Sequence, residues 1–217
     1  MKPIIGIINR KEKLKSNNKI LYIYEEISNK IKKSNGIPIG INPNIEEIEI
    51  VNGIILQGGN EFDKKEIEIV KYAYKNNIPL LGICLGMQII GFATCASEHN
   101  VNNHMKRNIN NVHEVLLKKE SKIYEILKKE KIIVNSRHNY QIKNTTLNIS
   151  GISKDNTIEV IEDKNKDFFI GIQWHPESLN NIDSKRIFDY FIEKASENGI
   201  KRNIKNNPWE NNKWKQN

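Results

Sequence analysis

The chain has 217 residues and a formal net charge of +8 at pH 7, a length that suits one domain with a full hydrophobic core. Its lysines alternate with glutamates and lack accompanying aromatic and arginine side chains, which favours a solvated surface over a nucleic-acid-binding one. No apolar stretch approaches the roughly 18 residues of a membrane span, and the N-terminal apolar run is too short for a signal peptide. We therefore expect a soluble, cytoplasmic protein without a nucleic-acid or membrane partner.

The first half of the chain alternates short apolar runs with amphipathic segments. Strands are predicted at residues 3–8, 37–41, 53–57 and 78–84, and helices at 20–36 and 64–77. Uninterrupted apolar strands between helices are typical of a parallel sheet that is covered on both faces.

Beyond residue 110 the pattern changes to short strands separated by turns. These strands are predicted at 111–117, 131–136, 147–153, 157–163 and 168–175, with a hairpin turn at 162–169 and a last amphipathic helix at 183–195. We expect one domain over residues 1–198 and a polar, basic tail over residues 199–217.

The stretch PLLGICLGMQII (79–90) places Cys84 between Gly82 and Gly86 where a strand turns into a helix. Glycines on both sides are expected to permit a sharp, strained turn, as in the Gly-x-Ser-x-Gly nucleophile elbow. The start of a helix favours an anion, which suits a reactive thiolate. The alternative is that Cys84 is a small buried apolar residue, and the other cysteine, Cys95, is too far along the helical region to bridge it.

The stretch GIQWHPES (171–178) offers a base for this cysteine. His175 ends an apolar strand, Pro176 stops the strand, and Glu177 is placed to hold the imidazole tautomer that accepts a thiol proton. Cys84, His175 and Glu177 are therefore a candidate catalytic triad, although His-Pro-Glu alone is equally an ordinary turn.

Together with the segments PIIGI, NGIPIGINPN, VNGIILQGGNEF, IIVNSRHNYQI and TIEVIED, these motifs resemble the class I glutamine amidotransferase family. The resemblance implies a single-domain, flavodoxin-like α/β fold with a central, mostly parallel sheet flanked by helices and a smaller antiparallel sheet. Within the family, LQGGN and VNSRH are most similar to the stand-alone γ-glutamyl hydrolases, the branch that includes γ-glutamyl-γ-aminobutyrate hydrolase.

The resemblance also implies roles for individual residues. The backbone N–H groups of Gly59 and Leu85 would form the oxyanion hole. The glutamyl part of the substrate would contact Gly58, Asn60, Gln88, Ser136, Arg137 and His138. The structural alternatives are a tight turn for the glycines and ordinary surface or strand-end polarity for the others.

Acyl transfer through a thioester needs no metal or cofactor, and none is expected. His99, His104 and His113 do not pair with another histidine or cysteine at metal-ligand spacing, so we expect them to be surface or core residues. The partner expected is a small γ-glutamyl substrate, and the sequence leaves the oligomeric state open.

The leaving group is not encoded in a motif. We favour a nucleotide-linked (CDP-type) glutamine, hydrolysed to a nucleoside diphosphoramidate for capsule modification, because Arg137 and the basic chain suit an anionic substrate. The alternatives are a γ-glutamyl amine or peptide hydrolase, a glutaminase subunit that delivers ammonia to a synthetase, and a non-catalytic relative that binds a small molecule. Residues 93–104 replace the Gly-Gly-x-Leu turn usual in the branch, which leaves the leaving-group side undefined.

Overall fold

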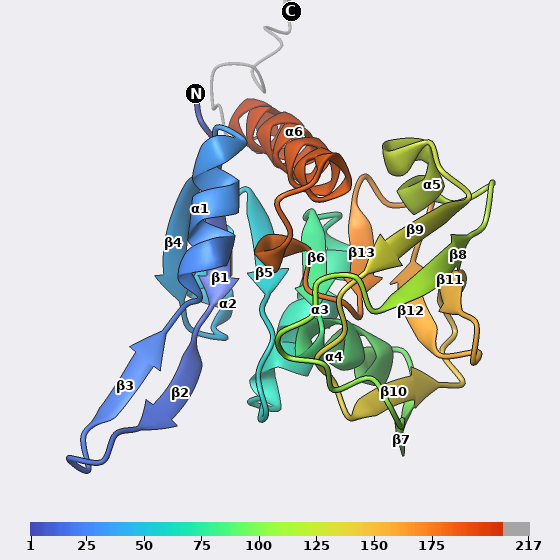
Figure 1. The fold of residues 1–217 in the computed structure, drawn as a ribbon. Helices are drawn as coiled ribbons and strands as arrows, with labels where there is room; N and C mark the ends of the chain where they lie inside the picture. The colour runs from blue at the N-terminus through green and yellow to red at the C-terminus, as the bar shows by residue number, and fades with distance from the viewer. Residues whose placement is uncertain (206–217) are drawn as a thin grey trace, which may run out of the picture.

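A nine-stranded mixed sheet forms the centre of the structure, a computed structural model that describes residues 1–205 (Figure 1). In spatial order its strands are β4 (Ile37–Ile41), β1 (Ile4–Ile8), β5 (Gly53–Leu56), β6 (Leu80–Ile83), β13 (Phe169–Ile172), β12 (Ile158–Glu162), β11 (Asn148–Ser153), β8 (His113–Leu117) and β9 (Lys131–Val134). The first five are parallel to one another, and each later strand is antiparallel to its neighbour.

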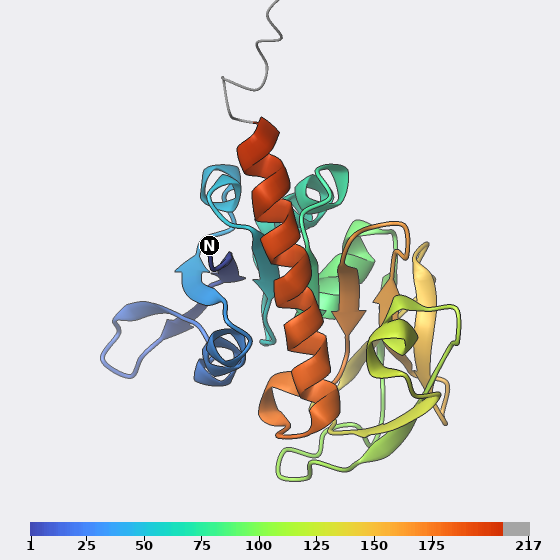
Figure 2. The ribbon, with the colours of Figure 1, turned by 90° about the horizontal axis from the view of Figure 1, so that it is seen from above.

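Helices cover both faces of the sheet, which explains why its central strands are apolar without alternation. One face packs against α1 (Glu25–Lys33), α5 (Lys122–Leu127) and α6 (Ile182–Lys205). The other packs against α2 (Ile45–Glu49), α3 (Lys65–Lys75) and α4 (Leu85–Ala93). Figure 2 shows α6 crossing in front of the strands with α3 and α4 behind them. None of the helices described is long and apolar enough for a membrane crossing.

The predicted α/β fold with a mostly parallel central sheet and flanking helices is confirmed, with one difference in layout. The antiparallel strands extend the main sheet, and within residues 1–205 the separate sheets are two antiparallel strand pairs. These pairs are β2 (Arg10–Lys13) with β3 (Lys19–Tyr22), and β7 (Ser97–Asn100) with β10 (Tyr140–Lys143).

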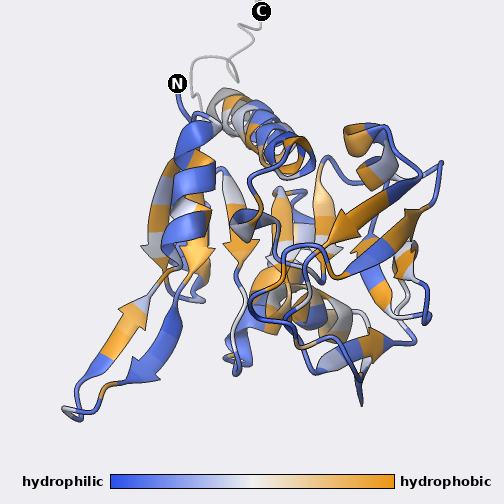
Figure 3. Cartoon of the chain, viewed as in Figure 1, coloured by the Kyte–Doolittle hydropathy of each residue, from blue (hydrophilic) through white to orange (hydrophobic). Residues whose placement is uncertain are grey.

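Two element boundaries differ from the sequence prediction by more than three residues. The segment 20–36 begins as β3, and its helix starts only at Glu25, because β3 pairs with the hydrophilic strand β2 (Figure 3). The last helix runs on to Lys205, helped by an Asn198 Nδ2 bond to the Asn52 carbonyl (2.9 Å). The start of the predicted tail is therefore helical, residues 206–217 lie outside the described part, and the division at 198/199 stays a prediction.

Three neighbouring parallel strands, β5, β6 and β13, deliver the predicted site residues. Their carboxyl ends lead to the glycine pair at 58–59, to Cys84 and to His175. Since carboxyl ends of parallel strands meet at one edge of a sheet, three segments far apart in sequence converge there.

Candidate active site

Cys84 is the N-cap of α4 and follows β6 directly. Its backbone has φ 53° and ψ −107°, a combination that non-glycine residues rarely adopt and that costs about 1–3 kcal/mol. The Cys84 N–H donates to the Ile172 carbonyl (2.8 Å), and the Gln88 N–H donates to the Cys84 carbonyl (3.2 Å). The strand on one side and the helix on the other thus hold the cysteine in its strained conformation.

The two elbow glycines serve close packing, which corrects the reason given for them from the sequence. No described glycine has a positive φ. A Cβ atom on Gly86 would lie 1.9 Å from the Leu56 carbonyl oxygen, and one on Gly82 would lie 2.6 Å from the Gly86 carbonyl oxygen. The strain of the turn therefore falls on Cys84 itself.

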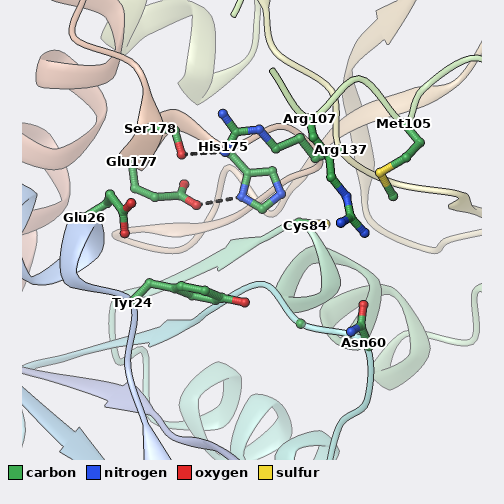
Figure 4. A pocket seen from close by; sticks show the side chains of 11 residues that line it. Tyr24, Glu26, Asn60, Cys84, Met105, Arg107, Arg137, His175, Glu177 and Ser178 are labelled. Carbon is green, nitrogen blue, oxygen red and sulfur yellow. Dashed lines mark hydrogen bonds and ion pairs between the residues drawn. The ribbon is translucent and has the colours of Figure 1, made fainter. Parts of the chain in front are cut away.

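His175 and Glu177 form a close pair beside the cysteine. His175 Nδ1 lies 2.6 Å from Glu177 Oε1, and Figure 4 shows the imidazole between that carboxylate and Cys84. Burial acts to lower the pKa of His175, but Glu177 and the Cys84 sulfur outweigh it and raise this pKa to about 10. Asn135 fixes the His175 backbone, accepting from its N–H and donating to its carbonyl, both at 2.8 Å.

A buried arginine supports the glycine loop. Arg10 Nε donates to the Gly58 carbonyl (3.0 Å), while Nη1 donates to both Glu66 oxygens (2.6 and 2.8 Å). A Cβ atom on Gly59 would lie 2.9 Å from Arg10 Nε and 3.3 Å from Leu85 Cδ2. The structure thus brings Gly59 and Leu85, the predicted oxyanion-hole residues, side by side; their catalytic role stays a prediction.

A pocket of about 300 Å³ opens over these groups. It is lined by Tyr24, Glu26, Gly59, Asn60, Cys84, Met105, Arg107, Arg137, His175, Glu177 and Ser178 (Figure 4). The sequence singled out six of these residues. The other five come from a helix start, a loop without regular structure and a short turn, where no motif marked them.

Two guanidinium groups give the pocket a binding capacity for anions. Arg137 Nη1 donates to Ser178 Oγ (3.0 Å), and its buried Nε has no hydrogen-bond partner among the described residues. Arg107 lines the same pocket and is exposed. Guanidinium groups bind carboxylate and phosphate in a bidentate manner.

Four predicted substrate contacts lie outside the pocket lining. Gln88 Nε2 donates to the Tyr140 carbonyl (3.1 Å) and to Gln173 Oε1 (3.3 Å), and Gln173 Nε2 lies 3.7 Å from Cys84 Sγ. Ser136 and His138 are buried against His104. Gly58 is also outside the lining but close to His175, whose Cε1 would be 3.1 Å from an added Cβ. The substrate-binding roles of these residues stay predictions.

The model of the peptidase C26 family matches residues 60–177, a span that contains Cys84, His175 and Glu177. The chain belongs to this family. Peptidase C26 is a class I glutamine amidotransferase family, so membership indicates a hydrolase that acts on amide C–N bonds.

Similarity to individual proteins agrees with this family and extends over most of the chain. A CTP synthase of Hydrogenobaculum sp. is 31% identical over 88% of this chain and 43% of that enzyme, so the chain spans less than half of it. Protein NtpR of Enterococcus hirae is 25% identical over 89% of this chain and 100% of its own length. The glutaminase domain of Trypanosoma brucei CTPS has a TM-score of 0.67 at 15% identity, covering 90% of this chain and 94% of that domain, which shows the shared fold.

Proposed function

We propose that the chain hydrolyses a γ-glutamyl amide through a γ-glutamyl thioester on Cys84. The observation that carries this proposal is the strained cysteine beside the His175–Glu177 pair in an open pocket. A thiol, an imidazole and a carboxylate in this arrangement are the groups that nucleophilic acyl transfer requires.

In the first half-reaction the Cys84 thiolate attacks the γ-carbonyl carbon. A C–S bond forms, and the oxyanion is stabilised by the N–H groups of Gly59 and Leu85. The protonated His175 then gives its proton to the amide nitrogen, the C–N bond breaks and the amine leaves. Glu177 holds the ring and stabilises its charged form.

In the second half-reaction water replaces the amine. The water oxygen attacks the thioester carbon, and His175, now neutral, takes a proton from that water. The C–S bond breaks, glutamate leaves, and the thiolate and imidazolium are restored. Every step uses side chains that the structure gathers around one pocket.

For the leaving group we propose an anionic, nucleotide-linked glutamine of the CDP type. Arg107 and Arg137 support this choice, since both line the pocket and a diphosphate offers negative charge that free glutamine lacks. The product would be a nucleoside diphosphoramidate. Its use in capsule modification is part of the proposal and rests on the sequence resemblance alone.

A second candidate is a glutaminase that delivers ammonia to a synthetase. The similarity to CTP synthase and to the glutaminase domain of CTPS favours it. The pocket would then take glutamine itself, and a partner protein would be needed for full activity.

The test is glutamate release by the purified chain from glutamine, γ-glutamyl amines and a CDP-linked glutamine, with Cys84→Ser as the control. We expect the nucleotide-linked compound to be the best substrate and the control to be inactive. A glutamyl adduct on the peptide containing Cys84, trapped by acid quench and found by mass spectrometry, would establish the thioester. Turnover by Cys84→Ser would refute the mechanism, and weak turnover rescued by a synthetase would favour the second candidate.

A further inference from the structure

Three histidines and one glutamate gather away from the pocket lining. His104 lies in the loop before β8, His113 begins β8, His138 precedes β10, and Glu159 lies in β12. Glu159 Oε1 is 2.9 Å from His113 Nε2, 3.6 Å from His104 Nδ1 and 3.9 Å from His138 Nε2. His104 Nδ1 and His138 Nε2 are 3.1 Å apart. The ligand atoms of His104, His113 and Glu159 therefore all lie within 4.8 Å of one another, and His138 Nε2 lies beside two of them.

The carboxylate in this cluster is buried without compensation. Glu159 is 0% exposed, and neither of its oxygens has a hydrogen-bond partner among the described residues. His113 Nε2 lies within 2.9 Å but has no hydrogen-bond partner either, so its N–H direction misses the oxygen. Burying an unpaired carboxylate is costly, and a cation at this point would remove the cost.

The tautomers of two histidines also indicate that the cluster needs a cation. His104 Nε2 lies 3.0 Å from Asp155 Oδ2, and His138 Nδ1 lies 2.9 Å from the Tyr140 carbonyl oxygen. Because a carboxylate and a carbonyl only accept, these two nitrogens carry the protons. His104 Nδ1 and His138 Nε2 are then lone pairs that face each other. The Ser136 hydroxyl, whose Oγ lies 3.1 Å from His104 Nδ1, can donate to that nitrogen, so the unsatisfied lone pair is the one on His138 Nε2.

We propose that His104 Nδ1, His113 Nε2, His138 Nε2 and Glu159 Oε1 bind a divalent transition-metal ion, with Zn²⁺ the best match. Tetrahedral zinc with bonds of about 2.0–2.1 Å has ligand atoms about 3.3 Å apart, and the four separations given above, 2.9–3.9 Å, bracket that value. Imidazole-rich sites suit zinc more than magnesium or calcium.

The outer contacts of the cluster match those of metal-binding histidines. A ligating histidine usually donates its other N–H to a carboxylate or a backbone carbonyl, as His104 and His138 do here. The His113 side chain is 18% exposed and that of Asp155 is 51% exposed, which leaves an approach from solvent.

Four protein ligands make a closed site, so the ion would be structural. It would tie the irregular segment after β7 to β8 and β12. Met105 and Arg137, the residues that follow His104 and precede His138, form a β-bridge and line the pocket. A metal at this point would therefore fix one wall of the active site, with His138 as a ligand instead of a substrate contact.

The experiment measures zinc binding to the tag-free full chain in a Cys84→Ser/Cys95→Ser background, which removes both thiols as competing ligands. Competition with a chromophoric chelator should give one Zn²⁺ per chain with a Kd below about 1 μM. Glu159→Gln and His104→Gln should each raise that Kd at least about a hundredfold, and Asp155→Asn about 10- to 100-fold. His99→Gln, an exposed histidine outside the cluster, is the matched control and should leave it unchanged.

X-ray absorption of the zinc-loaded background protein gives a readout that does not depend on the folding of variants. The expected spectrum has a four-coordinate shell of nitrogen and oxygen with imidazole scattering. Binding weaker than about 10 μM, a six-coordinate shell, or equal weakening by His99→Gln would overturn the proposal.

Discussion

The two cysteines stand at opposite ends of α4 and share an unusual feature, a positive φ of 53° at Cys84 and 66° at Cys95. At the C-terminal end, the Cys95 N–H donates to the Phe92 carbonyl (3.3 Å) and the Ala96 N–H to the Gly91 carbonyl (2.9 Å). These two bonds are those of a helix C-terminus that ends in a residue with left-handed backbone conformation, a position usually occupied by glycine. At the N-terminal end, Cys84 starts the helix and turns from β6 into it.

Although both cysteines have a positive φ, the surroundings of their side chains differ. Cys84 is buried, lies beside His175, and meets the end of the helix that favours negative charge. Cys95 is exposed at the opposite end, where the helix favours positive charge. Backbone strain alone therefore does not mark a nucleophile; the partners around the sulfur do.

The largest difference between the two cysteines is expected when each sulfur is removed in turn. Cys84→Ala should lower kcat/KM by on the order of 10⁴-fold or more, because the atom that forms the thioester is lost. Cys95→Ala should keep kcat/KM within about twofold. Both are measured by glutamate release, with circular dichroism as the check on folding. A Cys84→Ala chain that still turns over would make the two cysteines equivalent.

The partners of Cys84 can be weakened without touching the sulfur. Glu177→Gln should lower kcat by about 10²- to 10⁴-fold. It should also move the alkaline limb of the pH–rate profile to lower pH. Against the effect of burial, Glu177 and Cys84 together raise the His175 pKa to about 10, and the protonated ring is the acid. Glu26→Gln, another carboxylate of the pocket lining, is the matched control and should leave the limb in place.

The glycine loop beside Cys84 offers a sharper test of positioning. Arg10→Met should lower kcat about 10- to 100-fold by releasing the loop at Gly58. It should also lower stability by about 3–5 kcal/mol, because Glu66 is left buried without its partner.

The double variant Arg10→Met/Glu66→Leu separates these two effects. Replacing a whole buried ion pair with apolar side chains is often neutral for stability. We therefore expect the midpoint of urea unfolding to recover while kcat stays low. If the urea midpoint and kcat both recovered, the role of Arg10 would be purely structural.

A smaller effect is expected at the anion-binding side of the pocket. Arg137→Ala should lower kcat/KM about tenfold for the nucleotide-linked substrate and change it little for glutamine. Added salt should reduce the preference of the wild-type chain by screening. Equal losses on both substrates would place Arg137 at the glutamyl half, and a preference for uncharged amines would exclude the nucleotide substrate.

The smallest effect concerns Cys95. Glycine adopts a left-handed conformation without a Cβ penalty, so Cys95→Gly should raise the free energy of unfolding by about 1 kcal/mol. Urea unfolding measures this, and activity should not change. A loss of stability would show that the Cys95 side chain contributes packing that outweighs its backbone conformation.

The parts of the site that the sequence could predict are those in which local pattern and position coincide. Cys84 is flanked by glycines at a strand–helix junction, and His175 and Glu177 follow an apolar strand within one short motif. Buried strands such as β1 and β5 are predictable for the same reason, since all but the first residue of β1 and every residue of β5 are buried. Strand β2 is exposed at three of its four residues and carries no apolar pattern, so the sequence does not predict it.

The remainder depends on contacts between distant segments. Arg10 and Glu66 form their ion pair although they are 56 positions apart, and the sequence near either residue does not indicate the other as its partner. His104, His138 and Glu159 come from separate elements whose register and loop path decide their approach. Neither spacing nor composition encodes such a meeting point, so the sequence alone does not predict that these histidines come together.

The strained backbone at Cys84 also has an evolutionary consequence. Glycine would relieve that strain, so the sequence that gives the most stable elbow differs from the one that gives an active enzyme. A single base change converts a cysteine codon to a glycine codon. Where selection for turnover ends, we expect descendants of this protein to acquire glycine at position 84 and to gain stability as they lose catalytic activity.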